Sequence, residues 1–391
     1  MAQHRMYCHQ PYPSAERKNY RCWIAAGKTG IFSADFSSQT QALNHIHQSV
    51  VTAPLSVTYL TQHPKHPVLY AVLRGEGFGQ IHAYGLAKGG ELSLLNQIDV
   101  PAGAAHCSID CEGKFLLVAY YTSGKAGIYP LDDSGHLSGT RHEIHFTGHS
   151  LHPGRQTSPH PHWIGCNPKN DAVYITDLGR DEISVYQRHP ISGKLLCQQQ
   201  ISVAPGSGPR HIAFHPSLDI VYVTHELRPG ISRYRCDTRT GKLYIQETQY
   251  IQEKSCIQEK LCIQEILDSL TGQKHVTGQT CSEEMYNASD LTIHPSGRFL
   301  YVLNRGVAVI SVFSIHQKTG ELKLMASEPA YTPSCRNITL TPDGQWMFVT
   351  GEFSNSVVIF RVNQKTGELA WLPPIVEVPN AMLTLIGLAD E

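Results

Sequence analysis

The residues that can carry chemistry recur at two fixed distances from six turn residues: Pro64, Glu112, Pro168, Pro216, Pro295 and Pro342. Six residues before the last five of these stand His106, His162, Arg210, Ser289 and Arg336. Ten residues after the six turn residues stand Arg74, Thr122, Leu178, Glu226, Arg305 and Glu352. Histidine transfers protons near neutral pH, and arginine binds oxyanions through planar charged donors. Acid–base chemistry beside bound negative charge is possible if the fold gathers these side chains.

The segments around the turns have the pattern of β-hairpins. Residues 211–216 lead through a proline turn to the apolar stretch 220–224, and residues 290–295 lead in the same way to 299–302. Short alternating strands with Gly, Pro and Asp turns, and no long stretch of 3.6-residue periodicity, predict an all-β structure.

A second pattern, Gly-x-Leu, recurs in phase with the hairpins. It begins at Gly90, Gly135, Gly193, Gly241, Gly320 and Gly367, with a degenerate copy at Gln41-Ala42-Leu43. The leucines are 45 to 58 residues apart, except for one interval of 79 residues. About 48 residues is the size of a four-stranded antiparallel blade, so seven units predict a seven-bladed β-propeller. Two stacked β-sandwiches are the alternative.

The two ends of the chain predict how the ring closes. Residues 20–26 read as a second strand without a first, and residues 379–386 read as a first strand without a second. The C-terminal strand should therefore complete the N-terminal blade and remove the exposed edges of an open ring. We expect a polar N-terminal extension over residues 1–18 and one propeller domain over 19–391. Within that domain we expect a loop insertion over 245–285, where Ile-Gln-Glu recurs every six residues.

A propeller would bring the two sets of ionisable residues together. The start of the first strand and the end of the second lie at the same edge of an antiparallel hairpin, and the first strand of each blade lines the central channel. Both sets should therefore ring one mouth of that channel, unless they only solvate it or form ion pairs between blades. His106 and Thr122 are expected to be structural, and His63, His215 and His294 are expected to cap the proline turns.

Several segments of the chain carry a family resemblance: 158–162, 176–179, 205–211, 225–227 and 304–306. The most specific of them is Gly-Pro-Arg-His, whose arginine is followed fifteen residues later by His225-Glu226-Leu227. These segments resemble the seven-bladed propeller lactonases, which include propeller-type 6-phosphogluconolactonase and carboxy-cis,cis-muconate cyclase. The resemblance implies a catalytic group of His162 or its neighbour His160 with Arg210, Glu226 and Arg305. All of these except His160 belong to the rings obtained from spacing.

The resemblance implies hydrolysis of 6-phosphoglucono-1,5-lactone. His162 would be the general base, oriented by Glu226, while Arg210 would face the oxyanion and Arg305 would supply a second cation. Further substrate contacts are expected from His160, His211 and Arg336. Lactonisation of a carboxylated muconate remains an alternative, because arginine binds carboxylate and phosphate alike. A propeller that only binds other proteins is another, since fold does not fix function.

Composition and missing motifs exclude other classes. The formal net charge of −1 does not favour nucleic acid as a partner, and no apolar run approaches the ~18 residues of a membrane span. No phosphate loop, dinucleotide fingerprint or nucleophile elbow is present, and the histidines of 142–162 lack metal-site spacing. We therefore expect no cofactor and no metal. Eleven cysteines without a CxxC pair, and a polar N-terminus, favour a cytoplasmic protein, which we expect to be a monomer.

Overall fold

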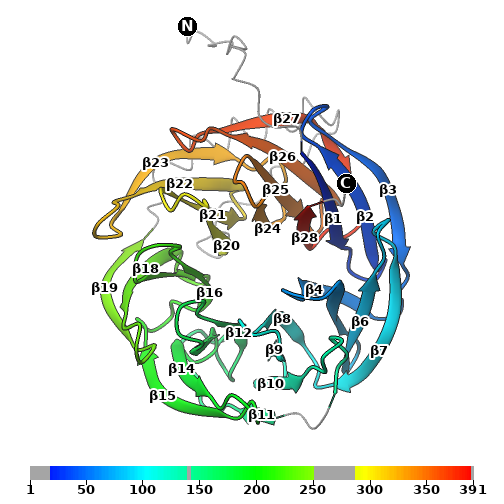
Figure 1. The fold of residues 1–391 in the computed structure, drawn as a ribbon. Helices are drawn as coiled ribbons and strands as arrows, with labels where there is room; N and C mark the ends of the chain where they lie inside the picture. Colours follow the sequence, from blue (N-terminus) through cyan, green and yellow to red (C-terminus); the bar gives the residue numbers. More distant parts are fainter. Residues whose placement is uncertain (1–17, 139–141, 251–286, 389–391) are drawn as a thin grey trace, which may run out of the picture.

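The computed structural model describes residues 18–138, 142–250 and 287–388. Its strands form seven four-stranded antiparallel sheets around a central axis (Figure 1). The predicted all-β, seven-bladed propeller is confirmed. The described residues include no helix that is long and apolar enough to span a membrane.

The blades are given in chain order, each from its innermost to its outermost strand. Blades 1 to 4 consist of β28 (Leu383–Leu388), β1 (Asn19–Ala25), β2 (Ile31–Ser37) and β3 (Ala42–Val50); β4 (Ser56–Gln62), β5 (Val68–Arg74), β6 (Gly79–Leu86) and β7 (Leu92–Val100); β8 (Ala104–Ile109), β9 (Phe115–Tyr120), β10 (Lys125–Pro130) and β11 (His142–His145); and β12 (Pro161–Cys166), β13 (Val173–Asp177), β14 (Glu182–Arg188) and β15 (Leu195–Ser202). Blades 5 to 7 consist of β16 (Pro209–Phe214), β17 (Ile220–His225), β18 (Gly230–Cys236) and β19 (Leu243–Tyr250); β20 (Asn287–Ile293), β21 (Phe299–Arg305), β22 (Val309–Ile315) and β23 (Leu322–Pro329); and β24 (Cys335–Leu340), β25 (Trp346–Gly351), β26 (Ser356–Val362) and β27 (Leu369–Glu377).

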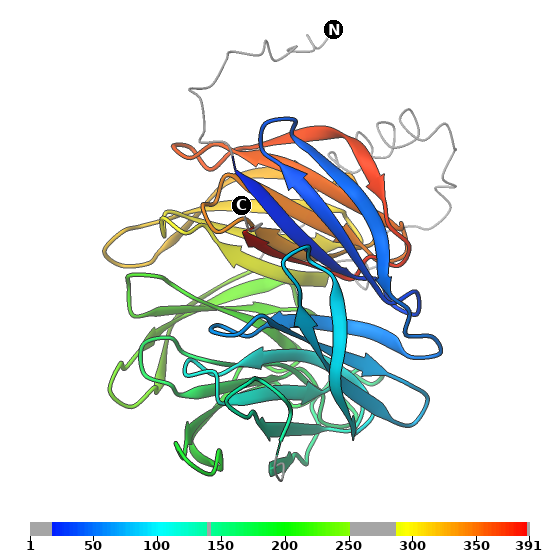
Figure 2. The ribbon, with the colours of Figure 1, turned by 45° about the vertical axis from the view of Figure 1, so that its right-hand side comes forward.

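The two ends of the chain close the ring in one blade, as predicted. Strand β28 pairs antiparallel with β1, with Cys22 opposite Ile386 and Ala25 opposite Leu383. Figure 2 shows the dark red C-terminal strand beside the blue N-terminal strands. Because β28 is the innermost strand of its blade, the ring has no open seam at the channel.

The core lies between neighbouring blades. In the second strand of most blades almost every side chain is buried, as in β9, whereas the outer strands alternate or face solvent. The apolar clusters join second and third strands of one blade to the inner strands of the next. Strands buried on both faces are expected to read as continuous apolar runs, and this explains the six-residue apolar sequence of β9.

The recurring Gly-x-Leu pattern marks a contact between blades. The glycine adopts a positive φ of 70–83° at positions 135, 241, 320 and 367, a conformation that glycine adopts without strain. Its carbonyl accepts a hydrogen bond from a tyrosine on the second strand of the preceding blade: Tyr70 to Gly135, Tyr174 to Gly241, Tyr222 to Gly320 and Tyr301 to Gly367. At each of these blade junctions the glycine of the repeat therefore provides a hydrogen-bond acceptor for a buried tyrosine hydroxyl.

The histidines that precede turn prolines cap the turns, as predicted. The His215 Nδ1 atom accepts the backbone N–H of Ser217 at 3.2 Å and of Leu218 at 2.9 Å. Its Nε2 atom donates to the carbonyl of Gly297 in the next blade at 2.8 Å. His63 makes the equivalent contacts with its own turn and with Gly113.

These buried histidines make the stability of the fold depend on pH. Burial lowers the pKa of His63, His106, His162, His211, His215, His225 and His294, and that of His225 falls from 6.5 to about 4. The unfolded chain therefore binds more protons below pH 6.5. We expect the free energy of unfolding to be greatest above pH 6.5 and to fall as the pH drops toward about 4. Denaturant unfolding at pH 7 and pH 5 tests this, and equal midpoints would contradict it.

Two predicted segments fall mainly outside the described residues. The polar N-terminal extension covers 1–18, of which only residue 18 is described. Of the predicted insertion over 245–285, residues 245–250 form the end of β19, and the rest lies outside the described residues. The domain boundaries remain predictions.

Candidate functional site

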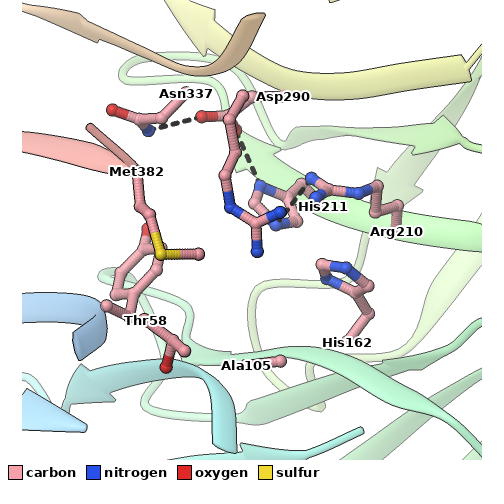
Figure 3. Close-up of a pocket in the computed structure, with 10 residues that line it drawn as sticks. Thr58, Ala105, His162, Arg210, His211, Asp290, Asn337 and Met382 are labelled. Carbon is pink, nitrogen blue, oxygen red and sulfur yellow. Dashed lines mark hydrogen bonds and ion pairs between the residues drawn. The ribbon is translucent and has the colours of Figure 1, made fainter. Parts of the chain in front are cut away.

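One mouth of the channel contains a pocket formed by the starts of the inner strands (Figure 3). It is lined by Thr58, Tyr59, Ala105, His162, Arg210, His211, Asp290, Arg336, Asn337 and Met382. These residues come from all seven blades, because Met382 directly precedes β28. The structure therefore brings His162, Arg210 and Arg336 of the first predicted ring to one place, whereas His106 and Ser289 do not line the pocket.

Six of the inner strands contain a β-bulge at the end that lies at this mouth. In β4, β8, β12, β16, β20 and β24 the register with the second strand shifts near the first residues. The residues skipped by the register are Thr58, Ala105, His162, Arg210 with His211, Ser289 and Arg336. A bulged residue leaves the regular alternation of the strand, and all of these except Ser289 line the pocket. The bulges therefore aim His162, Arg210 and Arg336 at one volume.

In blade 3 the positions obtained from spacing are wrong by one residue. The Asp110 carboxylate accepts the backbone N–H of Lys114 and Phe115 at 2.7 and 2.8 Å, and so takes the capping position that His215 holds in blade 5. The residue equivalent to the turn proline is then Cys111, and not Glu112. Counting from Cys111 gives Ala105, which is the bulged residue, and Tyr121 in place of Thr122.

His106 is buried in the way expected of a structural residue. Its ring packs against Tyr59 and Trp163, and its Nδ1 atom accepts a long hydrogen bond, 3.4 Å, from the backbone N–H of Ile164. Burial lowers the pKa of His106 well below 6.5, so the imidazole is neutral beneath the pocket.

Glu226, directly after β17, is surrounded by three arginines. Its Oε2 accepts a hydrogen bond from Arg210 Nε at 2.7 Å, while Oε1 lies 2.7 Å from Arg155 Nη2 and 3.2 Å from Arg305 Nη2. Burial alone would raise the pKa of this carboxyl, but Arg305, Arg210 and Arg155 outweigh it and lower the pKa to about 2. Glu226 is therefore a permanent anion that holds the guanidinium groups in place.

The loop before β16 fixes the position of Arg210. Asp181, at a positive φ of 53°, accepts the backbone N–H groups of Gly206 and Gly208, each at 2.6 Å. Gly208 itself has a φ of 64°, and a Cβ there would lie 2.7 Å from the Leu227 side chain. The glycines of segment 205–211 are therefore needed for one tight turn. This turn places Arg210 at the mouth of the channel.

Arg210 is also held from its other side by a buried chain of hydrogen bonds. Its Nη1 lies 3.1 Å from His211 Nε2, and His211 Nδ1 lies 2.7 Å from Asp290 Oδ1. Asn337 donates to the second oxygen of Asp290 at 2.6 Å (Figure 3). Burial and the neighbouring Arg210 lower the pKa of His211. The neutral ring therefore donates from Nδ1 to Asp290 and accepts at Nε2, so it uses both nitrogens to orient Arg210.

His162 differs from the histidines around it. It is 7% exposed, and its Nδ1 atom is buried with no hydrogen-bond partner among the described residues. Its ring contacts those of Tyr121 and His211, with centroids 5.6 and 5.2 Å away. Burial, Arg210 and His211 lower its pKa well below 6.5. His162 therefore presents a neutral imidazole to the pocket at pH 7.

His160 lies outside the pocket. Its ring stacks on Tyr121 with a centroid distance of 4.3 Å, and its Nδ1 is hydrogen-bonded to the Tyr121 carbonyl at 2.8 Å. Its backbone N–H donates to Asp177 at 2.7 Å. Of the two candidates for the base, the geometry therefore favours His162, and His160 positions Tyr121 beside it.

The remaining cations stand around the rim. Arg336 is hydrogen-bonded through Nη1 to Glu352 at 3.0 Å, and burial lowers its pKa. The Arg305 side chain is 27% exposed, and its Nε atom is buried with no partner in the described part of the chain. Both guanidinium groups therefore retain donors that can meet an anion entering the mouth.

Tyr121, Arg155 and Asp290 are among the residues of the site that escaped the sequence analysis. Tyr121 was missed because Cys111 replaces a turn proline, and alignment on Asp110 would have found it. Arg155 lies in the long connection between β11 and β12, outside the repeat, where Gln156 anchors the loop by donating to the Leu178 carbonyl at 2.8 Å. Asp290 acts across blades on His211, and the spacing within one hairpin carries no signal of such a contact.

Fold and site together define a seven-bladed propeller with arginines and a neutral histidine at one mouth of its channel. The family model described as "Lactonase, 7-bladed beta-propeller" matches residues 21–386, and the chain belongs to this family. It is 32% identical to the 6-phosphogluconolactonase of Bacillus subtilis over 304 residues, which cover 77% of this chain and 78% of that protein. It is 30% identical to the 6-phosphogluconolactonase of Formosa agariphila over 319 residues, which cover 79% and 81%.

Solved structures show the same fold at lower identity. A protein from Lactobacillus plantarum superposes with a TM-score of 0.80 at 22% identity, over 94% of this chain and 99% of that one. The periplasmic gluconolactonase of Pseudomonas aeruginosa superposes with a TM-score of 0.79 at 21% identity, over 95% and 100%.

Proposed function

We propose that this protein hydrolyses 6-phosphoglucono-1,5-lactone to 6-phosphogluconate. The observation that carries the proposal is the pocket in which a neutral, buried His162 faces Arg210 and Arg336. Relatives at 30–32% identity are named 6-phosphogluconolactonase, which supports this substrate for the pocket.

The chemistry follows from the charge and tautomer of each group. A water attacks the lactone carbonyl carbon while His162 accepts its proton, and the carbonyl oxygen becomes an oxyanion. Arg210 meets this oxyanion through Nη2, because its Nε and Nη1 are occupied by Glu226 and His211. The tetrahedral intermediate then collapses, the ring C–O bond breaks, and protonated His162 returns the proton to the leaving ring oxygen.

Glu226 acts differently from the role expected for it. Among the described residues it contacts Arg155, Arg210 and Arg305, whereas His162 contacts Tyr121 and His211. We therefore assign Glu226 to positioning the arginines rather than the base. Burial lowers the pKa of His162 in the free protein, and the charges of Arg210, Arg336 and Arg305 lower it further. An anionic substrate offsets their charge and makes His162 a stronger base when substrate is bound.

The phosphate end of the substrate has a place beside this pocket. A second hollow shares Met382 with the first and is lined by Lys28, Ser56, Arg74 and Glu352. Glu352 is paired with Arg336, while no ion pair joins Lys28 or Arg74 to an acidic side chain in the described ranges. We assign the phosphate to Arg74 and Lys28 with Arg336 between the two hollows.

Arg74→Ala should raise the KM for the phosphorylated lactone about 5- to 10-fold while kcat changes little, because the contact is the same in ground and transition states. The KM for unphosphorylated glucono-1,5-lactone should not change. Steady-state kinetics on both substrates measure this, with Lys365→Ala on an exposed turn as the control. An equal rise of KM for both lactones would contradict the assignment.

The proposed substrate is tested by comparing three reactions of the purified protein. We expect acceleration of 6-phosphogluconolactone hydrolysis well above the spontaneous rate, weaker acceleration with gluconolactone, and no lactonisation of 3-carboxy-cis,cis-muconate. Lactonisation of the muconate with no phospholactone hydrolysis would establish the cyclase alternative. A folded protein without either activity would favour a propeller that only binds.

A further inference from the structure

Two cysteines meet at the junction of blades 3 and 4, at the end of the blades opposite the mouth. Cys111 lies in the turn between β8 and β9, and Cys166 is the last residue of β12. Both are free thiols; Cys111 is exposed and Cys166 is partly buried. The Cys111 Sγ atom lies 3.6 Å from the carbonyl oxygen of Asn167, the residue that directly follows Cys166. The two thiols are close enough for each to shift the pKa of the other.

Both cysteines depart from the repeat that builds the fold. Cys111 occupies the turn position where the other hairpins have Pro64, Pro168, Pro216, Pro295 and Pro342. Cys166 stands where the equivalent strands of blades 5 to 7 end in Phe214, Ile293 and Leu340. The fold therefore does not require a cysteine at either position. The two cysteines lie on opposite sides of the same blade junction.

The surroundings give the two thiols different reactivity. The interaction with Cys166 lowers the pKa of the Cys111 thiol, although burial and the carboxylates of Asp171 and Asp110 oppose this. The same interaction and burial raise the pKa of Cys166. Arg188, which is ion-paired with Asp110 and Asp171, adds positive charge nearby. An accessible thiol of lowered pKa beside a second thiol is the arrangement found at redox-sensitive cysteines.

We propose that Cys111 and Cys166 form an oxidation site that reacts with hydroperoxides and closes into a disulfide between blades 3 and 4. The Cys111 thiolate attacks one peroxide oxygen, the O–O bond breaks, and one water (or alcohol) leaves after protonation. The Cys166 sulfur then attacks the resulting sulfenic acid, its S–O bond breaks, and a water leaves. The two thiols are oxidised by two electrons to one disulfide, and the peroxide is reduced.

The disulfide would tie the β8–β9 turn to the end of β12. Strand β12 carries His162 near its start, but the bond forms at the far end of the strand. Cross-linking residues 111 and 166 closes a loop of about 55 residues, and closing such a loop reduces the entropy of the unfolded chain. The oxidised protein should therefore unfold at a higher temperature than the reduced protein.

Peptide mapping after brief treatment with stoichiometric hydrogen peroxide tests this proposal. Digestion without reductant should yield a cross-linked peptide containing Cys111 and Cys166, with a mass two hydrogens below the sum of its parts. Cys197→Ser, which removes an exposed cysteine on β15, should give the same product. Cys166→Ser should instead accumulate a sulfenic acid at Cys111 that dimedone traps, and Cys111→Ser should leave Cys166 reduced.

Two results would overturn the proposal. The first is oxidation of Cys111 no faster than that of Cys197, with no 111–166 peptide in folded wild-type protein. The second is a 111–166 peptide that forms only after the protein is unfolded. Because the readout is a covalent bond, it is independent of whether the protein hydrolyses a lactone.

Discussion

Arg210→Ala is expected to lower kcat/KM for 6-phosphogluconolactone by about 10²-fold or more, because removal of one preorganised oxyanion donor costs that much in a buried site. Arg210 reaches the pocket with two of its donors held by Glu226 and His211, so its free Nη2 needs no reorganisation. Burial, Arg305 and Arg336 lower its pKa, to about 10, and the group stays charged at neutral pH. Coupled kinetics with circular dichroism measure the loss in folded protein.

Two further variants make the Arg210 result specific. Arg210→Lys keeps a charge but loses the planar fork that bridges Glu226 and His211, so it should also lose most activity. Arg239→Ala, on the exposed turn before β19, should retain wild-type kinetics. Near-normal turnover by a folded Arg210→Ala or Arg210→Lys protein would remove Arg210 from the mechanism.

Glu226→Gln is expected to lower the free energy of unfolding by about 3–5 kcal/mol, because removing one partner of a buried ion pair leaves uncompensated charge. The substitution would leave Arg210 buried beside Arg155 and Arg305 without the anion that they share. Activity should fall with stability, since Arg210 loses the group that aims it. Urea unfolding monitored by fluorescence measures the change.

Glu352→Gln provides the matched control for Glu226. Within the described ranges Glu352 is ion-paired with a single arginine, Arg336, and its side chain is 22% exposed. Because both side chains of this pair are partly exposed and only one arginine loses its partner, the variant should lose less stability than Glu226→Gln. Equal stability losses in the two variants would contradict the special role of the three-arginine cluster.

The propeller and its ring of ionisable residues follow from the sequence for a geometric reason. Fixed distances on either side of a turn become fixed positions on a hairpin, and seven repeats then superpose them at one mouth. Where the repeat is altered, fixed spacing no longer gives the right positions. In blade 3, Cys111 replaces the turn proline and shifted the expected positions by one residue.

Contacts between blades could not be predicted from residue spacing within one hairpin. His211 was expected to touch substrate, yet Asp290 from the next blade engages one ring nitrogen and Arg210 the other. Arg155 comes from the long connection between β11 and β12, which has no counterpart among the other described connections between blades. The sequence shows that Glu226 is acidic, but it does not show that three arginines from three segments pair with this carboxylate. These ion pairs are the reason that Glu226 orients the arginines and not the base.

The most direct test of the account is the rate of 6-phosphogluconolactone hydrolysis by the wild type and by His162→Asn at neutral pH, with the spontaneous rate subtracted. Asparagine occupies a similar volume but cannot accept the proton of the attacking water. We predict clear acceleration by the wild type and a loss of about 10²–10⁴-fold in a variant that folds normally. Unchanged turnover in folded His162→Asn protein, or no acceleration by the wild type, would contradict the account.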